Sequence, residues 1–227
     1  MNYTVYNMNK LNAEHSPKKI DGFIFFSSLE DRSWNIIDYM NKNNNIPRQV
    51  LIIKSLKDED SFERNCENYN EIRFTVSTIS EFSYCNMIEC LKGIHEYLND
   101  KDTIGIDISV MPIPVFSQIL HLIIEKHSTI KIIVYYTEPK HYNLDNIFDY
   151  SGNDGEVNIN IIPGFEGETA RPTSQKRMIL YILGFEMNYL NKLIPQDTNP
   201  DGIIPINGFP SYYPKYKDIS LVNNNVN

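Results

Sequence analysis

The chain has 227 residues, of which 41% are hydrophobic and 12% aromatic, and this composition excludes a disordered chain. The formal net charge is -8 and no cluster of Lys and Arg stands out, which disfavours direct binding to a nucleic-acid backbone. No apolar run approaches the roughly 20 residues of a membrane span. Three cysteines, Cys66, Cys85 and Cys90, are too few for a disulfide framework, which is typical of a cytoplasmic protein.

Apolar segments alternate with amphipathic segments through the first two thirds of the chain. Near-continuous apolar runs predict buried strands at residues 20–26, 49–54, 72–76, 103–109 and 130–137. The segments between them predict helices at residues 29–41, 58–69, 82–98 and 115–125, the last of them introduced by Pro112 and Pro114. Such alternation is typical of a Rossmann-like α/β fold, with a mostly parallel sheet and helices on both faces.

The last third of the chain has a less regular pattern. Strands are predicted at residues 157–162, 178–183 and 203–206, although residues 178–193 could also form one helix broken at Gly184. We therefore expect a flexible N-terminal arm over residues 1–19, a Rossmann-like core over residues 20–150, and an irregular C-terminal part over residues 151–227 that completes or covers the sheet.

Polar residues follow several of the predicted strands. In open parallel sheets, ligands bind outside the carboxyl ends of the strands, so these residues form one candidate site. Asp107 and Glu166 are the candidate catalytic carboxylates. The candidate ligand-binding residues are Ser27, Ser28, Arg32, Ser109, Gly164, Gly167 and Arg171, with the two arginines as possible anion clamps.

Each of these residues also has a purely structural interpretation. Ser27 and Ser28 could cap the helix that follows them, and Asp107 and Ser109 could cap the helix after Pro112. Arg32 could pair with a surface carboxylate, and the glycines could serve turns alone. Because these candidate residues are all predicted to lie at one edge of the sheet, the functional interpretation is favoured.

Several well-known motifs are absent from the sequence. There is no G-x-x-x-x-G-K phosphate loop, no G-x-G-x-x-G after the first predicted strand, and no G-x-S-x-G elbow. Cys85, Cys90 and His95 are spaced by five residues, which points their side chains to different faces of a helix. We therefore predict no metal site and no bound cofactor.

A stretch rich in tyrosine and proline, residues 208–216, lies near the end of the chain. Tyr-rich loops form good interfaces, so this stretch is a candidate docking surface for a protein partner. The alternative is a tail that packs over the sheet by apolar contacts.

Residues 21–33, Asp-Gly-Phe-Ile-Phe-Phe-Ser-Ser-Leu-Glu-Asp-Arg-Ser, resemble the start of TIR domains, where a first strand ends in a serine-containing loop followed by an acidic pair. In catalytic TIR domains a later glutamate cleaves the nicotinamide bond of NAD, but Glu89 and Glu96 do not lie in a motif of that family. The predicted strand order also resembles the Rossmann-like sensor domains of prokaryotic antiviral systems, which bind cyclic or linear nucleotides.

Three functional hypotheses follow from the sequence. The first is a domain that binds a nucleotide or another phosphorylated small molecule at the sheet edge. The second is an enzyme that cleaves a nucleotide glycosidic bond, with Asp107 or Glu166 as the essential carboxylate. The third is a non-catalytic subunit of a larger complex that binds its partner through residues 208–216.

Overall fold

The computed structural model describes residues 20–28, 30, 32–43, 45, 47, 49–55, 75–82, 87–137, 162, 165, 178–183, 201–206 and 221. The chain divides into two compact units, Met1–Pro139 and Lys140–Asn227. The predicted N-terminal arm and the predicted boundary between residues 150 and 151 lie outside the described residues, so both stay predictions.

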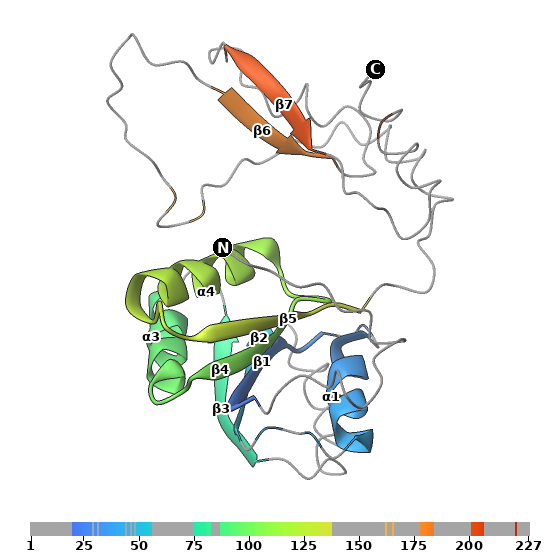
Figure 1. Ribbon diagram of the computed structural model, residues 1–227, viewed down its shortest axis with the longest axis vertical. Helices are drawn as coiled ribbons and strands as arrows, with labels where there is room; N and C mark the ends of the chain where they lie inside the picture. Colours follow the sequence, from blue (N-terminus) through green and yellow to red (C-terminus); the bar gives the residue numbers. More distant parts are fainter. Residues whose placement is uncertain are drawn as a thin grey trace. The chain divides into compact units, whose positions relative to one another are not determined.

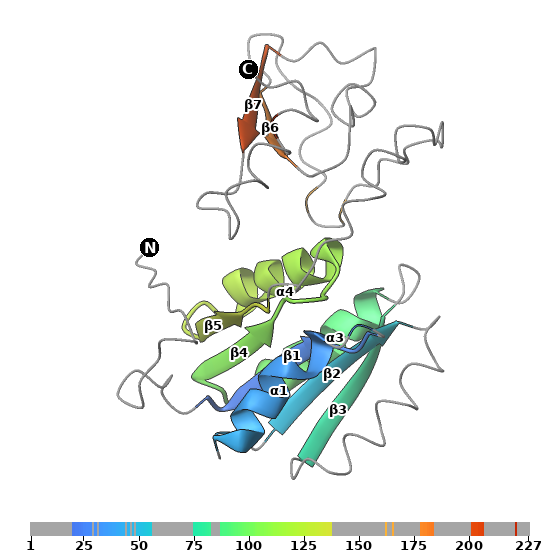
Figure 2. The same cartoon turned by 90° about the vertical axis from the view of Figure 1, so that its right-hand side faces the viewer.

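The first unit is built on a five-stranded sheet in the order β3-β2-β1-β4-β5. Every neighbouring pair of strands is parallel, and Figures 1 and 2 show the sheet from two sides. Its strands are β1 (Gly22–Phe26), β2 (Gln49–Ser55), β3 (Thr75–Phe82), β4 (Thr103–Asp107) and β5 (Lys131–Tyr135). The predicted Rossmann-like α/β architecture with a parallel sheet is confirmed.

Helices cover both faces of this sheet. Helix α1 (Arg32–Lys42) packs on one face, and α3 (Met87–Leu98) and α4 (Ile113–Lys126) pack on the other (Figure 1). Because strand side chains alternate between the two faces, β1 contributes Phe23 and Phe25 to the core beneath α1, and Ile24 and Phe26 to the core beneath α3 and α4. Among the helices that the structure describes, none is long and apolar enough to cross a membrane.

One predicted strand was placed too early in the sequence. The third strand was expected at residues 72–76, with a helix beginning at Phe82, but β3 runs from Thr75 to Phe82 and α3 begins at Met87. Ser and Thr residues in 77–80 look like a connector, yet they continue the β-branched pattern, and their backbone pairs with β2. The helix predicted at residues 58–69 lies outside the described residues.

In the second unit, the described elements are the strands β6 (Met178–Ile182) and β7 (Gly202–Ile206), which pair in parallel. The predicted strands at 178–183 and 203–206 are therefore confirmed, and the alternative of a helix is wrong over Met178–Ile182. The strand predicted at residues 157–162 lies outside the described residues, apart from Ile162.

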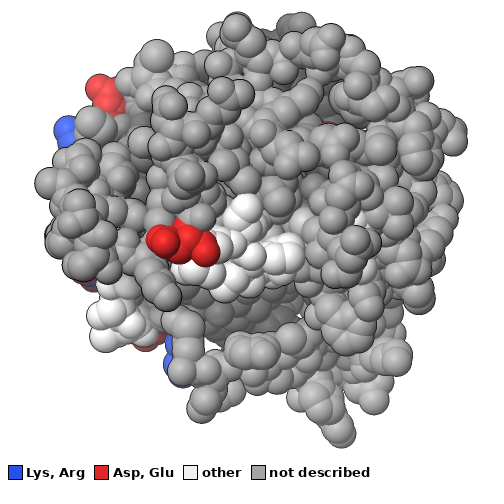
Figure 3. All heavy atoms as spheres, turned by 90° about the horizontal axis from the view of Figure 1, so that it is seen from above, with Lys and Arg blue, Asp and Glu red and all other residues white. Residues whose placement is uncertain are grey.

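One face of the β6–β7 pair carries large apolar side chains that are exposed. The register places these five side chains on the same face: Met178, Leu180, Ile182, Ile204 and Ile206. Figure 3 shows the molecule from above, with uncharged described residues in white beside a few acidic ones in red. An isolated two-stranded pair is only marginally stable, so the stability of this pair depends on packing of this face.

The hydroxyl of Tyr97, on α3, lies between the beginnings of β1 and β2. It accepts a hydrogen bond from the Phe23 N–H at 2.8 Å, and it lies 2.9 Å from the carbonyl oxygen of Gln49, to which it donates. We expect Tyr97→Phe to lower the free energy of unfolding by about 1–3 kcal/mol, because a buried N–H loses its partner. Urea unfolding followed by the fluorescence of Trp34, the single tryptophan, measures this change.

Gly22 provides the control for this prediction. A Cβ at Gly22 would lie 2.5 Å from the Tyr97 hydroxyl oxygen, so Gly22→Ala must displace that hydroxyl. Removing the hydroxyl makes room for the Cβ. Gly22→Ala should therefore lower the free energy of unfolding by less in the Tyr97→Phe variant than in the wild type. If the losses in free energy of unfolding of the two single variants simply add in the double variant, the hydroxyl does not occupy this position.

A pair of histidines joins the ends of α3 and α4. The Nδ1 atom of His95 lies 2.8 Å from the Nε2 atom of His127, a distance at which one neutral ring donates a hydrogen bond to the other. Burial, together with the nearby His95, lowers the pKa of His127 below the ordinary value of 6.5. The folded state therefore disfavours the protonated ring.

This histidine pair predicts a pH dependence of stability. The contribution of the pair to folding stability is fully present above about pH 6.5. It is lost as the pH falls through the lowered pKa, because the unfolded chain then binds more protons than the folded protein. Relative to His127→Gln, the wild type should lose stability between pH 7 and pH 5. Thermal unfolding of both proteins across this interval checks the prediction, and parallel curves would contradict it.

Candidate functional site

The connections that follow β1 and β4 lead to opposite faces of the sheet. These two strands are neighbours, but β1 is followed by α1 on one face and β4 by α4 on the other. In open α/β sheets, the crevice for a ligand forms at the carboxyl ends of two strands whose connections diverge in this way. We call this position, which the strand order alone defines, the β1–β4 crevice.

Asp107 is the last residue of β4 and lies at the β1–β4 crevice. It pairs in register with Phe25 of β1, and its side chain is on the α1 face, because Ile106 before it belongs to the core on the other face. Only 3% of Asp107 is exposed. A carboxylate so deeply buried at the end of a strand requires a compensating partner.

Ser109 provides part of that compensation. Its backbone N–H donates a hydrogen bond of 2.9 Å to Oδ1 of Asp107, and its hydroxyl donates to the same oxygen. The Ser109 hydroxyl also accepts a hydrogen bond of 2.8 Å from the N–H of Thr137, after β5. Together these bonds tie the ends of β4 and β5 to the carboxylate.

The capping interpretation of Asp107 and Ser109 is not what the structure shows. The residue that caps the N-terminus of α4 is Pro112, and no side chain makes a capping hydrogen bond there. The two residues instead bond to each other and to Thr137.

Two buried oxygens at the β1–β4 crevice have no hydrogen-bond partner among the described residues: Oδ2 of Asp107 and Oγ of Ser27. Ser27 continues β1, because its N–H donates to the carbonyl oxygen of Ile53, and it is 1% exposed. Because Ser27 lies two residues beyond Phe25, its side chain is on the same face of the sheet as Phe25 and Asp107, the face that α1 covers. Buried polar atoms are nearly always paired in native proteins, so these two oxygens, unpaired among the described residues, make this position the candidate ligand site.

Burial raises the pKa of Asp107 to about 6, against an ordinary value of 3.8. The hydrogen bonds from Ser109 and the positive charge of Arg32 act in the opposite direction but do not cancel the effect of desolvation. Asp107 can therefore exchange a proton near neutral pH, which suits it both to accept hydrogen bonds and to act as an acid or base.

Arg32, the first residue of α1, connects the loop after β1 to the end of β5. Its guanidinium donates to Oε2 of Glu30 at 2.9 Å from Nε, and one terminal nitrogen forms an ion pair with the same oxygen at 2.5 Å. The other terminal nitrogen donates to the carbonyl oxygen of Thr137 at 3.3 Å. The predicted pairing with a carboxylate is thus present, and it occupies the group that was expected to clamp an anion.

Ser28 organises the same loop. Its hydroxyl accepts a hydrogen bond of 3.2 Å from the N–H of Glu30. Its carbonyl oxygen accepts one of 3.2 Å from the hydroxyl of Ser33, which also lies 2.8 Å from the carbonyl oxygen of Glu30. Ser28 therefore shapes the turn that leads into α1, close to the β1–β4 crevice.

The structure brings together the predicted site residues Ser27, Ser28, Arg32, Asp107 and Ser109 at one edge of the sheet. The other predicted site residues, Gly164, Glu166, Gly167 and Arg171, lie outside the described residues, as do residues 208–216.

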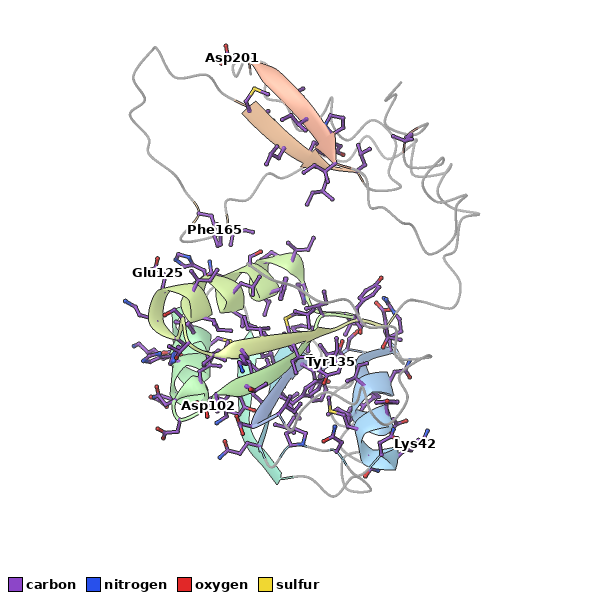
Figure 4. The ribbon with its side chains drawn as sticks, viewed as in Figure 1. Lys42, Asp102, Glu125, Tyr135, Phe165 and Asp201 are labelled. Carbon is purple, nitrogen blue, oxygen red and sulfur yellow. The ribbon has the colours of Figure 1, made fainter. Side chains whose placement is uncertain are left out.

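Sequence reasoning overlooked Tyr135, the last residue of β5. Its ring packs edge-on against Phe23 beneath α1, and its hydroxyl is buried without a hydrogen-bond partner among the described residues. Figure 4 shows Tyr135, labelled, among the side chains of the first unit. A tyrosine that ends an apolar strand is the signal that could have identified it.

No group of three or more His, Cys, Asp and Glu side chains suitable for a metal ion occurs in the part of the chain that the structure describes. No protein-family model matches the sequence, and a search of curated proteins also finds no match.

Proposed function

We propose that the first unit binds a nucleotide or a similar phosphorylated small molecule at the β1–β4 crevice. The observation that supports this proposal is a pair of buried oxygens, on Ser27 and Asp107, that have no partner among the described residues and lie where the strand connections diverge. Leaving such groups unpaired costs stability, and a ligand that hydrogen-bonds to them offsets that cost. As part of the same proposal, the domain acts as a nucleotide sensor like those of prokaryotic antiviral systems, and the strand order supports this by analogy alone.

A second candidate function is cleavage of a nucleotide glycosidic bond. The observation that favours it is the state of Asp107, because one carboxylate oxygen is held by Ser109 while the other has no partner among the described residues. A carboxylate with a pKa of about 6 can take up a proton or stabilise a developing positive charge on the sugar ring. Substrate consumption by the wild type that is absent from Asp107→Asn even at saturating substrate would distinguish catalysis from binding.

Isothermal titration calorimetry against a panel of ribonucleotides, including NAD, tests the binding proposal. We expect at least one member of the panel to bind to the wild type, and Asp107→Asn and Ser27→Ala to bind it at least tenfold more weakly. The matched controls are Asp38→Asn and Ser128→Ala, which make the same chemical changes at exposed positions and should leave binding unchanged. Absence of binding across the panel would refute the proposal.

A further inference from the structure

We propose that the base of the β1–β4 crevice receives a pair of neighbouring hydroxyls, such as the 2′,3′-diol of a ribose, and that any phosphate of the ligand lies farther out. This inference rests on the proposed function and deepens it, since it names the part of the ligand that meets Asp107 and Ser27.

The carboxylate of Asp107 selects for a hydrogen-bond donor. Its Oδ1 atom already accepts two hydrogen bonds from Ser109, whereas Oδ2 has no partner among the described residues. An ionised carboxylate oxygen can only accept, so the ligand must present an O–H or N–H group there. A phosphate at the same place would bring two negative charges together in a buried setting, which is strongly unfavourable.

The hydroxyl of Ser27 provides the second contact. The register pairs Phe25 with Asp107, so Ser27 lies two residues farther along the neighbouring strand. The strand rise and spacing then place the Cα atoms of Ser27 and Asp107 about 8 Å apart. Two adjacent ligand hydroxyls, each making a hydrogen bond of roughly 2.8 Å, can bridge side chains at this separation. Because a serine hydroxyl both donates and accepts, it suits a hydroxyl partner in either direction.

The charges around the crevice argue against a buried phosphate. Arg32 is the basic residue that acts on Asp107, and its guanidinium is already held by Glu30 and by the carbonyl oxygen of Thr137. A phosphate at the base would therefore lack a free cation among the described residues. At the start of α1, a phosphate could instead meet the positive end of an 11-residue helix.

Ligand entry requires a local rearrangement, because the two oxygens, which lack a partner within the described part of the chain, are enclosed. The hydrogen bond from Arg32 to the Thr137 carbonyl oxygen is a weak link between α1 and the end of β5, since at 3.3 Å it lies beyond the usual distance range. Its loss would separate Arg32 from the end of β5.

The test compares ligands that differ only in the sugar hydroxyls. Calorimetry measures binding of the four ribonucleoside 5′-monophosphates, their 2′,3′-dideoxy counterparts, the free ribonucleosides, ribose, and inorganic phosphate. For the wild type, we expect loss of the diol to weaken binding roughly 10–100-fold, as for lost hydrogen bonds to a charged group. Loss of the phosphate should weaken binding less than loss of the diol does. In Asp107→Asn this discrimination should fall to a few-fold, while the exposed-site control Asp38→Asn should keep it.

Each outcome bears on at least one of the two proposals, and the outcomes distinguish failure of the diol inference from failure of the binding function. Dideoxynucleotides that bind as tightly as ribonucleotides would overturn the diol inference and leave the binding function intact. Binding of ribose or ribonucleosides, without any gain from a phosphate, would support the diol inference and refute the phosphorylated ligand. Binding of none of these compounds would overturn both.

Discussion

Replacing Asp107 with asparagine is expected to raise the free energy of unfolding by about 1–3 kcal/mol at pH 8. Burial raises the pKa of this carboxyl to about 6, so the folded protein holds the charge at pH 8 at a cost that the unfolded chain does not bear. An amide keeps an oxygen that can accept the hydrogen bonds from Ser109, and it carries no charge to desolvate. The gain is partly offset because Arg32 loses a favourable electrostatic interaction.

The pH dependence of this gain follows from the direction of the pKa change. Between about pH 4 and pH 6 the folded wild type binds more protons than the unfolded chain, so its stability falls as the pH rises across this interval. The variant lacks this titration. The stability difference between the two proteins should therefore be smallest near pH 4, grow up to about pH 6, and stay constant above it.

Chemical denaturation of both proteins at several pH values, followed by Trp34 fluorescence, measures this difference. Asp38→Asn, at an exposed position, is the matched control and should show no such pH-dependent gain. If Asp107→Asn instead lowers stability at every pH, the carboxylate is needed to hold Ser109 and Thr137, and a purely structural role explains its burial. A stabilised variant that binds ligand at least tenfold more weakly is the expected signature of a site that has been selected for function at the expense of stability.

The sequence predicted the parallel sheet because its strands are nearly continuous apolar runs separated by amphipathic helices. The same pattern placed Ser27 and Asp107 at one edge, since side chains that follow parallel strands meet there. Their burial could not be predicted, because it depends on how α1 packs over the ends of β1 and β4. Nor could the sequence show that Arg32 pairs with Glu30 and reaches Thr137, a contact between residues 105 positions apart. The boundaries of β3 were misplaced because Ser and Thr suit both loops and strands, and pairing with β2 decides between them.

Gly105→Ala is expected to lower the free energy of unfolding of the first unit by about 1–3 kcal/mol, the usual cost of overpacking a core. A Cβ at Gly105 would lie 2.7 Å from a ring carbon of Phe23 and 2.9 Å from one of Tyr135. Both rings are buried beneath α1, and in contact with each other, so neither can move aside without displacing its neighbours. Since Gly105 lies two residues before Asp107 on the same face of β4, the displacement also shifts the β1–β4 crevice, and we expect ligand binding to weaken with stability.

Gly202→Ala tests whether this cost comes from the rigidity of the neighbours. A Cβ at Gly202 would lie 2.7 Å from the terminal methyl carbon of Met178, an equally short distance, but that methionine is half exposed and flexible. We therefore expect Gly202→Ala to change stability by less than about 0.5 kcal/mol. Denaturation followed by Trp34 fluorescence measures the first unit, and far-ultraviolet circular dichroism also reports on the second. Equal losses in the free energy of unfolding for the two variants would mean that replacing a glycine is itself harmful. An unchanged stability of Gly105→Ala would show that the rings beneath α1 are loosely packed, and that the burial of Asp107 beside them does not depend on a tight fit.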